Sequence, residues 1–125
     1  MHPKVMNIYT ASILATGLIV SSCEQGVFCT EEFRSVGFQW TGASLPDSVY
    51  TVNGRTGDTL TALDKGYEAY FAVVDDSHMK SLSAGGDSLR TTVLDSTGTV
   101  VASAWYVVGR DNCHIVFRSG PEFLP

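Results

Sequence analysis

Residues 89–108 of the 125-residue chain, LRTTVLDSTGTVVASAWYVV, carry the pattern that decides the fold. Residues 89–94 and 99–108 are rich in β-branched and aromatic side chains, which are typical of strands. Between them, Asp95-Ser96-Thr97-Gly98 supplies the short polar residues and the glycine that tight turns use. The stretch therefore predicts a β-hairpin.

Similar runs recur on both sides of the hairpin, about ten residues apart. In Phe33 to Trp40, apolar side chains at 36, 38 and 40 alternate with small or polar ones, so one face of this strand is expected to be buried. Further strands are expected at residues 49–52, 59–62, 67–74, 113–118 and 122–124. One helical turn is expected around residues 77–82.

Seven or eight short strands without a long helix predict an all-β fold. The natural architecture is an antiparallel two-sheet sandwich of the immunoglobulin-like or transthyretin-like kind. A small barrel is the alternative. An α/β fold is disfavoured because no crossover helices are present.

The start of the chain has the organisation of a bacterial export signal. Lys4 gives a weakly basic beginning, and the mainly apolar residues 5–20 are too few for a membrane span, which needs about 20 residues. Residues 18–23, LIVSSC, form a lipobox: an aliphatic residue, two small residues and Cys23. We expect residues 1–22 to be a lipoprotein signal peptide and Cys23 to carry the lipid. The alternatives are an ordinary secretory leader and a short helix with a chance cysteine at its end.

Two further cysteines, Cys29 and Cys113, would lie in an oxidising compartment, where thiol pairs become disulfides. Two free or separately buried thiols are the alternative. Residues 23–28 would then form a short tether beside the lipid, with residues 24–28 reaching about 20 Å at most. Residues 29–125 are expected to fold as one β-sandwich domain.

The charge excludes some partners. The formal net charge is −5, and Lys4 is the only basic residue before Cys23. The remaining basic residues are scattered singly along the chain. Nucleic acid and anionic head groups both require concentrated positive charge, so neither is an expected partner. Attachment to a membrane is expected only through the lipid on Cys23.

Residues that could carry chemistry are sparse. His114 has no evident convergent partners and is expected to be an ordinary surface or edge histidine. Asp75 and Asp76, with Asp87 or Asp111, supply carboxylates of the kind calcium binds, but the spaced pattern of a calcium loop is missing. Aspartates in turns usually bond their own backbone. We expect no metal, no cofactor and no catalytic residues.

One aromatic pair is a candidate ligand contact. Trp105 and Tyr106 are neighbours in an expected strand, so their side chains point to opposite faces. One of them therefore lies off the core face unless both faces are covered. An outward aromatic ring could stack on a sugar or anchor a protein partner, and cross-strand packing would explain it equally well.

Several short motifs are similar to those of one group of envelope proteins. They are the lipobox, Tyr50-Thr51-Val52 before Thr56-Gly57-Asp58, Asp75-Asp76, and Asp111-Asn112-Cys113-His114-Ile115 with Ser119-Gly120. Together they resemble small lipoproteins of the Bacteroidetes type. The resemblance implies a β-sandwich in the cell envelope and supplies no catalytic residues.

The sequence thus favours a non-enzymatic interaction module of the cell envelope, lipid-anchored to a bacterial membrane, either at the outer membrane or at a periplasmic face. Its partner would be an envelope protein or a glycan. A small envelope hydrolase with a dispersed active site is one alternative, and a structural or inhibitory module is another.

Overall fold

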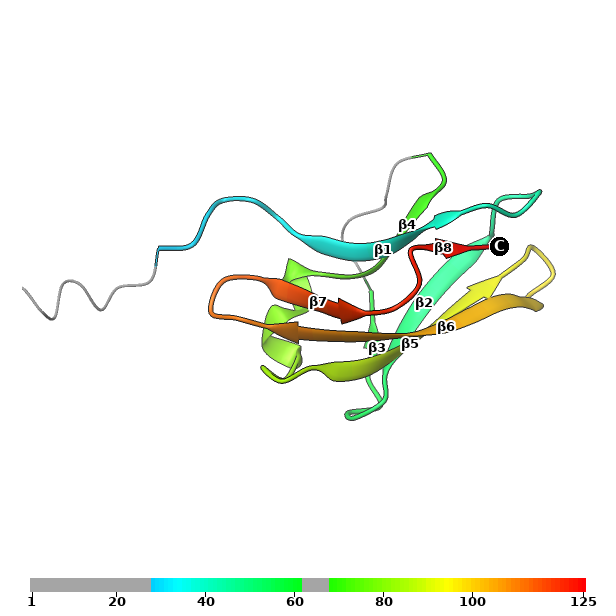
Figure 1. Cartoon of the computed structure of the whole chain (residues 1–125). Coiled ribbons are helices and arrows are strands. Elements are labelled where there is room, and N and C mark those ends of the chain that lie inside the picture. Colours follow the sequence, from blue (N-terminus) through cyan, green and yellow to red (C-terminus); the bar gives the residue numbers. More distant parts are fainter. Residues whose placement is uncertain (1–27, 62–67) are drawn as a thin grey trace, which may run out of the picture.

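The computed structural model describes residues 28–61 and 68–125, which form two β-sheets packed face to face (Figure 1). The elements are β1 (Ser35–Trp40), β2 (Ser48–Asn53), β3 (Thr59–Leu60), β4 (Tyr70–Asp75), the 3-10 helix η1 (Asp76–Ser81), β5 (Asp87–Leu94), β6 (Val100–Arg110), β7 (Ile115–Ser119) and β8 (Phe123–Leu124). The predicted all-β two-sheet sandwich is confirmed. Within the described ranges no helix is long and apolar enough to cross a membrane.

The smaller sheet has the order β4-β1-β8 and the larger has the order β3-β2-β5-β6-β7. All neighbouring strands are antiparallel except β1 and β8. The predicted hairpin forms β5 and β6 and lies at the centre of the larger sheet. Its turn is held by the Asp95 carboxylate, which accepts hydrogen bonds from the backbone N–H groups of Thr97 and Thr99.

The core lies between the sheets and draws on both. The predicted buried face of the first strand is confirmed, because residues 36, 38 and 40 are all buried. The Phe38 ring stacks on Phe71 of β4, with ring centroids 5.8 Å apart. The larger sheet contributes buried side chains from β5 and β6: Leu89, Val93, Tyr106 and Val108.

The strand expected at residues 67–74 differs from the prediction. β4 begins at Tyr70, residue 67 lies outside the described ranges, and Val73, Val74 and Asp75 are buried in succession. The pairing of β4 with β1 shifts register between Val36 and Gly37. Such a bulge places an extra residue in one strand and interrupts strict alternation. The helical turn predicted beyond β4 is present as η1.

The chain changes sheets between β7 and β8. It leaves the larger sheet at Ser119 and joins the smaller one at Phe123. Gly120 makes this crossing with φ of +143°, and a Cβ at this position would overlap the ring of Tyr106. The Tyr106 hydroxyl donates a hydrogen bond of 2.7 Å to the Pro121 carbonyl. One buried tyrosine therefore ties the crossing to the centre of the larger sheet.

Gly120→Ala should destabilise the fold more than Gly98→Ala. Both glycines have positive φ, but no atom lies within 4 Å of a Cβ at Gly98. Gly98→Ala should cost about 1 kcal/mol of backbone strain. Gly120→Ala adds overlap with Tyr106 and should cost about 3 kcal/mol. Urea unfolding measures both, and equal losses would contradict this role of the crossing.

Candidate functional site

The outward face of the larger sheet carries two aromatic rings with polar side chains around them. The strand register sets Val52, Arg90 and Trp105 in one row across β2, β5 and β6. Tyr50, Thr92 and Ser103 form the next row. We call these six residues the Trp105 face. Alternation along each strand turns them away from the core.

Both rings of the Trp105 face are open to solvent. Trp105 is 54% exposed and Tyr50 is 42% exposed. They line a hollow of about 420 Å³ together with the other members of the face. The guanidinium carbon of Arg90 lies 5.7 Å from the centroid of a Trp105 ring, a cation–π arrangement that holds both side chains in place.

The structure separates the two aromatic residues singled out in the sequence. Tyr106 is 0% exposed, so it belongs to the core and does not meet a surface ligand. Burial is the larger cause that raises the pKa of Tyr106 to about 12, and the nearby Tyr70 adds to it. The phenol therefore stays protonated. The prediction of a ligand contact therefore concerns Trp105 alone. Arg90 and Tyr50 were missed because only the strand register sets Arg90 opposite Trp105 and brings Tyr50 to the same face of the sheet.

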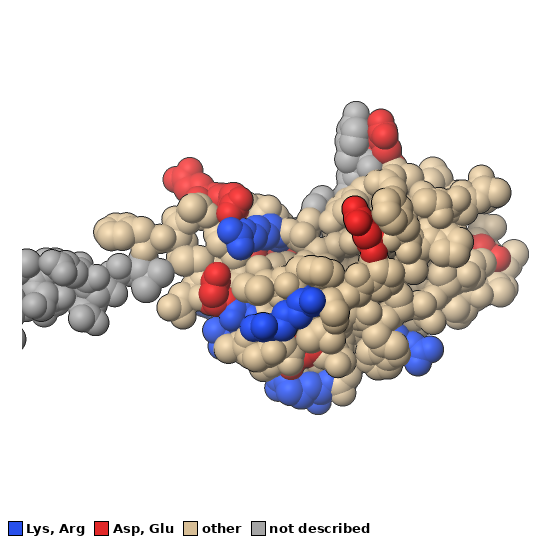
Figure 2. All heavy atoms as spheres, viewed as in Figure 1, with Lys and Arg blue, Asp and Glu red and all other residues tan. Residues whose placement is uncertain are grey.

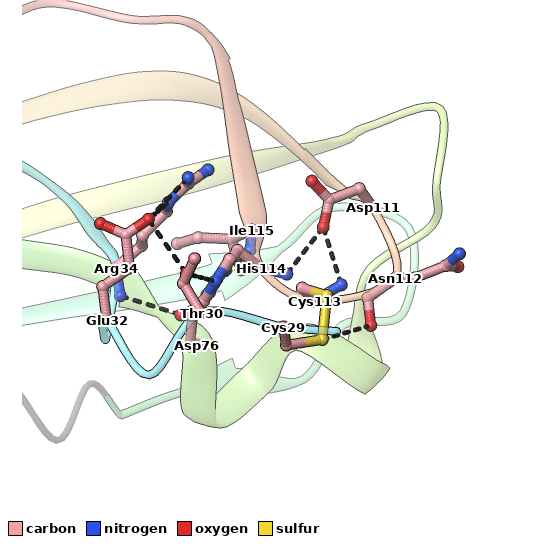
Figure 3. Close-up of a disulfide and its surroundings, with 10 residues drawn as sticks. All are labelled: Cys29, Thr30, Glu32, Arg34, Asp76, Asp111, Asn112, Cys113, His114 and Ile115. Carbon is pink, nitrogen blue, oxygen red and sulfur yellow. Dashed lines mark hydrogen bonds and ion pairs between the residues drawn. A yellow bond between two sulfur atoms is a disulfide. The ribbon is translucent and has the colours of Figure 1, made fainter. Parts of the chain in front are cut away.

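A second group of contacts surrounds the disulfide (Figure 3). The sulfurs of Cys29 and Cys113 lie at bonding distance, 84 residues apart in sequence, as predicted. The Asp111 carboxylate accepts hydrogen bonds of 2.8 Å from the backbone N–H groups of Cys113 and His114. These two hydrogen bonds are the main reason why the pKa of Asp111 is lowered. The β6–β7 turn therefore presents Cys113 to the start of the domain.

His114 is not a surface histidine, contrary to one part of the expectation of a surface or edge residue, although it lies directly before the edge strand β7. His114 is only 6% exposed, and its Nδ1 lies 2.7 Å from Asp76 Oδ2. Its Nε2 lies 2.9 Å from the hydroxyl of Thr30. The strand expected at residues 113–118 begins two residues later, because β7 starts at Ile115 and residues 113 and 114 belong to the preceding turn.

Asp76 is the centre of these contacts, at the start of η1. Its two carboxylate oxygens accept hydrogen bonds from the backbone N–H groups of Arg34 and Ile115, both 2.8 Å long, besides the contact with His114. We call Thr30, Arg34, Asp76, His114 and Ile115 the Asp76 clasp. It joins the segment before β1, the start of η1 and the start of β7. Nothing in the sequence near Asp76 signals partners 38 or 42 residues away.

The clasp lowers the pKa of Asp76. Burial alone opposes ionisation of this carboxyl, but the backbone hydrogen bonds from Arg34 and Ile115 and the contact with His114 outweigh it. The pKa of Asp76 is therefore below its ordinary value of 3.8. An ionised Asp76 is thus part of the folded structure at neutral pH.

The order of groups in the clasp, hydroxyl to imidazole to carboxylate, is also the order in nucleophilic triads. Asp76 holds the imidazole of His114, and the imidazole meets the exposed Thr30 hydroxyl. Four hollows of about 310 to 540 Å³ on the described surface are lined by other residues. Because the Asp76 carboxylate also holds the backbone N–H groups of Arg34 and Ile115, the geometry suits a structural link between three chain segments better than a substrate site.

The aspartates weighed as calcium ligands all bond to protein groups. Asp75 accepts from the backbone N–H of Ser77, and Asp76 and Asp111 are engaged as described. Asp87 is buried and accepts from Arg55, Asn53 and Ser83. The bonds from Arg55 are the first cause of a strongly lowered Asp87 pKa. Across residues 28–61 and 68–125, no three His, Cys, Asp or Glu side chains gather as a metal site would require.

The charged side chains on the face seen in Figure 2 are interspersed, with uncharged surface between them.

Cys23, the residue expected to carry the lipid, lies outside the described ranges, as does the expected signal peptide. Comparison of the chain with known protein families, with curated proteins and with solved structures finds no significant match.

Acid should destabilise the fold through Asp76. Its pKa is lower in the folded chain than the ordinary 3.8, so its stabilising contribution is complete above 3.8 and is lost as the pH falls through the lower, folded value. Asp76→Asn should therefore flatten the fall in unfolding free energy below pH 4 and should cost about 2 kcal/mol at pH 7. Urea unfolding between pH 2 and pH 7 measures both. An unchanged acid slope would contradict the prediction.

Proposed function

We propose that the chain is a non-enzymatic interaction module of the bacterial cell envelope, held by a lipid on Cys23, that binds a partner through the Trp105 face. The observation that carries the binding part is the exposure of Trp105 and Tyr50 around one hollow on the outward face of the sheet. Large, rigid aromatic rings supply a large contact area and lose little side-chain freedom when a partner binds. A hollow lined by two of them is a ready surface for a partner.

The lipid anchor is supported by the sequence and by the disulfide. Residues 18–23 form a lipobox. The Cys29–Cys113 bridge suits the oxidising compartment that an exported chain would reach. A chain fixed to the domain at Cys29 leaves only residues 24–28 between the lipid and the fold, so the disulfide end would lie close to the membrane.

The arrangement of the domain suits such an anchor. The segment that leads into β1, η1 and the β6–β7 turn lie at one end of the sandwich, and the β5–β6 turn lies at the other (Figure 1). The Trp105 face runs along the larger sheet between these ends. A domain fastened at its disulfide end would thus keep the Trp105 face free of its own anchor.

A hydrolase is the second candidate, and the observation in its favour is the Thr30–His114–Asp76 chain. The interaction module is preferred because the Asp76 carboxylate also holds the backbone of Arg34 and Ile115. These bonds give the clasp a structural role that needs no substrate.

Mass spectrometry of the protein from intact cells tests the anchor and the binding face together. We expect a chain that begins at Cys23 and carries two or three acyl groups, which Cys23→Ser removes. Hydroxyl-radical labelling in cells should oxidise Trp105 at least threefold less than in the purified protein. Phe117, which is 52% exposed and lies outside the Trp105 face, is the matched control and should be oxidised equally in both.

The two readouts separate the two parts of the proposal. An unacylated chain cut elsewhere would overturn the anchor. Equal oxidation of Trp105 in cells and after purification would overturn the binding face. Protection of Phe117 to the same degree would mean general shielding and would also overturn a specific role for Trp105.

The hydrolase alternative makes a distinct prediction. If the module is non-enzymatic, the Thr30→Ala and His114→Gln variants should release p-nitrophenol from p-nitrophenyl acetate at the same rate as the parent protein. If hydrolysis is lost in both the Thr30→Ala and the His114→Gln variants but is retained in a Thr30→Ser variant, the protein is a hydrolase and the interaction module is overturned. Circular dichroism confirms that the variants are folded.

A further inference from the structure

We infer that the Trp105 face binds an acidic glycan, with sugar rings on Trp105 and Tyr50 and a sugar carboxylate on Arg90. This inference rests on the proposed binding role of the same face and names the chemical class of its partner. Three features carry it: the spacing of the two rings, the hydroxyl groups between them and the single positive charge.

The spacing of the rings suits an extended ligand. Tyr50 and Trp105 lie on β2 and β6, with β5 between them, and their rows are two residues apart. Strand spacing and rise place their Cα atoms roughly 12 Å apart. The C–H face of a sugar ring carries partial positive charge and matches the negative face of an aromatic ring. Two rings so placed suit a chain of sugars better than a single one.

The floor between the rings carries hydroxyl groups. Thr92 and Ser103 share the row of Tyr50, and both line the hollow. A hydroxyl both donates and accepts hydrogen bonds, as sugar hydroxyls do. An apolar helix or strand laid on the same floor would leave these groups unpaired and desolvated, which weakens binding. The hydroxyl floor therefore favours a glycan over an apolar protein segment.

The charge of the face selects the kind of glycan. Among the described residues that line the hollow, Arg90 is the only charged one. Across the described ranges no carboxylate lies within salt-bridge distance of Arg90, and the whole chain has a net charge of −5. A guanidinium binds a carboxylate with two parallel hydrogen bonds. An isolated cation on the binding face of an acidic protein thus points to an anionic group on the ligand.

The experiment uses three polyuronates and their uncharged forms. Detergent-solubilised full-length protein is titrated with hexamers of oligogalacturonate, hyaluronan and alginate, and with the fully methyl-esterified form of each. Binding is followed by calorimetry and by tryptophan emission, in which a bound ligand should change the signal of the exposed Trp105 rather than that of the buried Trp40. We expect at least one free acid to bind about tenfold more tightly than its ester.

Matched variants assign the binding to the face. Trp105→Ala should weaken binding of the preferred hexamer at least tenfold, and Tyr50→Ala should weaken it to a similar degree. Arg90→Gln should bring the affinity for the acid down to that for the ester. Phe117→Ala removes an equally exposed ring elsewhere and should leave the affinity unchanged. Circular dichroism shows whether each variant is folded.

The outcomes distinguish this inference from the proposed function. Binding to none of the three polyuronates, or binding that Trp105→Ala leaves intact, overturns the glycan. Equal affinity for acid and ester, unaffected by Arg90→Gln, overturns the role of the carboxylate. If these results accompany protection of Trp105 in cells, the face still binds a partner and that partner is of another class. If Trp105 is unprotected as well, the proposed function falls with the inference.

Discussion

The fully buried Tyr106 sets the orientation of the central strand, and much of the surface follows from it. Its ring fills the space above Gly120, and its hydroxyl bonds the Pro121 carbonyl at the crossing between the sheets. Because side chains alternate along β6, a buried Tyr106 obliges Trp105 to face solvent. A shift of one residue in the strand register would turn Trp105 toward the core and Tyr106 toward solvent, so the core contacts of Tyr106 would be lost. The pairing of β5 with β6 then sets Arg90 directly opposite Trp105.

The disulfide and the Asp76 clasp fasten one end of the sandwich by different means. The disulfide joins residues 84 positions apart and restricts the unfolded chain as well as the folded one. The clasp acts only in the folded state, because Asp76 meets Arg34 and His114 only once the sheets have formed. Together they hold the segment before β1 on the domain, and this segment leads directly to the expected lipid. A force applied at the lipid would therefore reach β1 and β7 together.

Local patterns were enough to predict the hairpin of residues 89–108 and the buried face at 36, 38 and 40, because alternation and turn chemistry are properties of neighbouring residues. The same alternation could not decide which of Trp105 and Tyr106 faces inward, since both phases fit the pattern. The clasp was beyond reach for another reason. His114 lies in a turn rather than a strand, and its partner Asp76 becomes a neighbour only through the packing of η1 against the start of β7. Tyr50 and Arg90 likewise join Trp105 only through the strand register.

Folding alone gives little reason for a tryptophan at position 105. Cross-strand contact with Arg90 contributes roughly 0.2–1 kcal/mol, and many paired side chains on a solvated sheet would contribute as much. The core gains nothing from the ring, because Tyr106 already fills the inward position of this strand. More than half of the Trp105 side chain stays in water, where its apolar area stabilises nothing. That area is removed from water only when a partner covers it, and this is the physical ground of the proposed binding role.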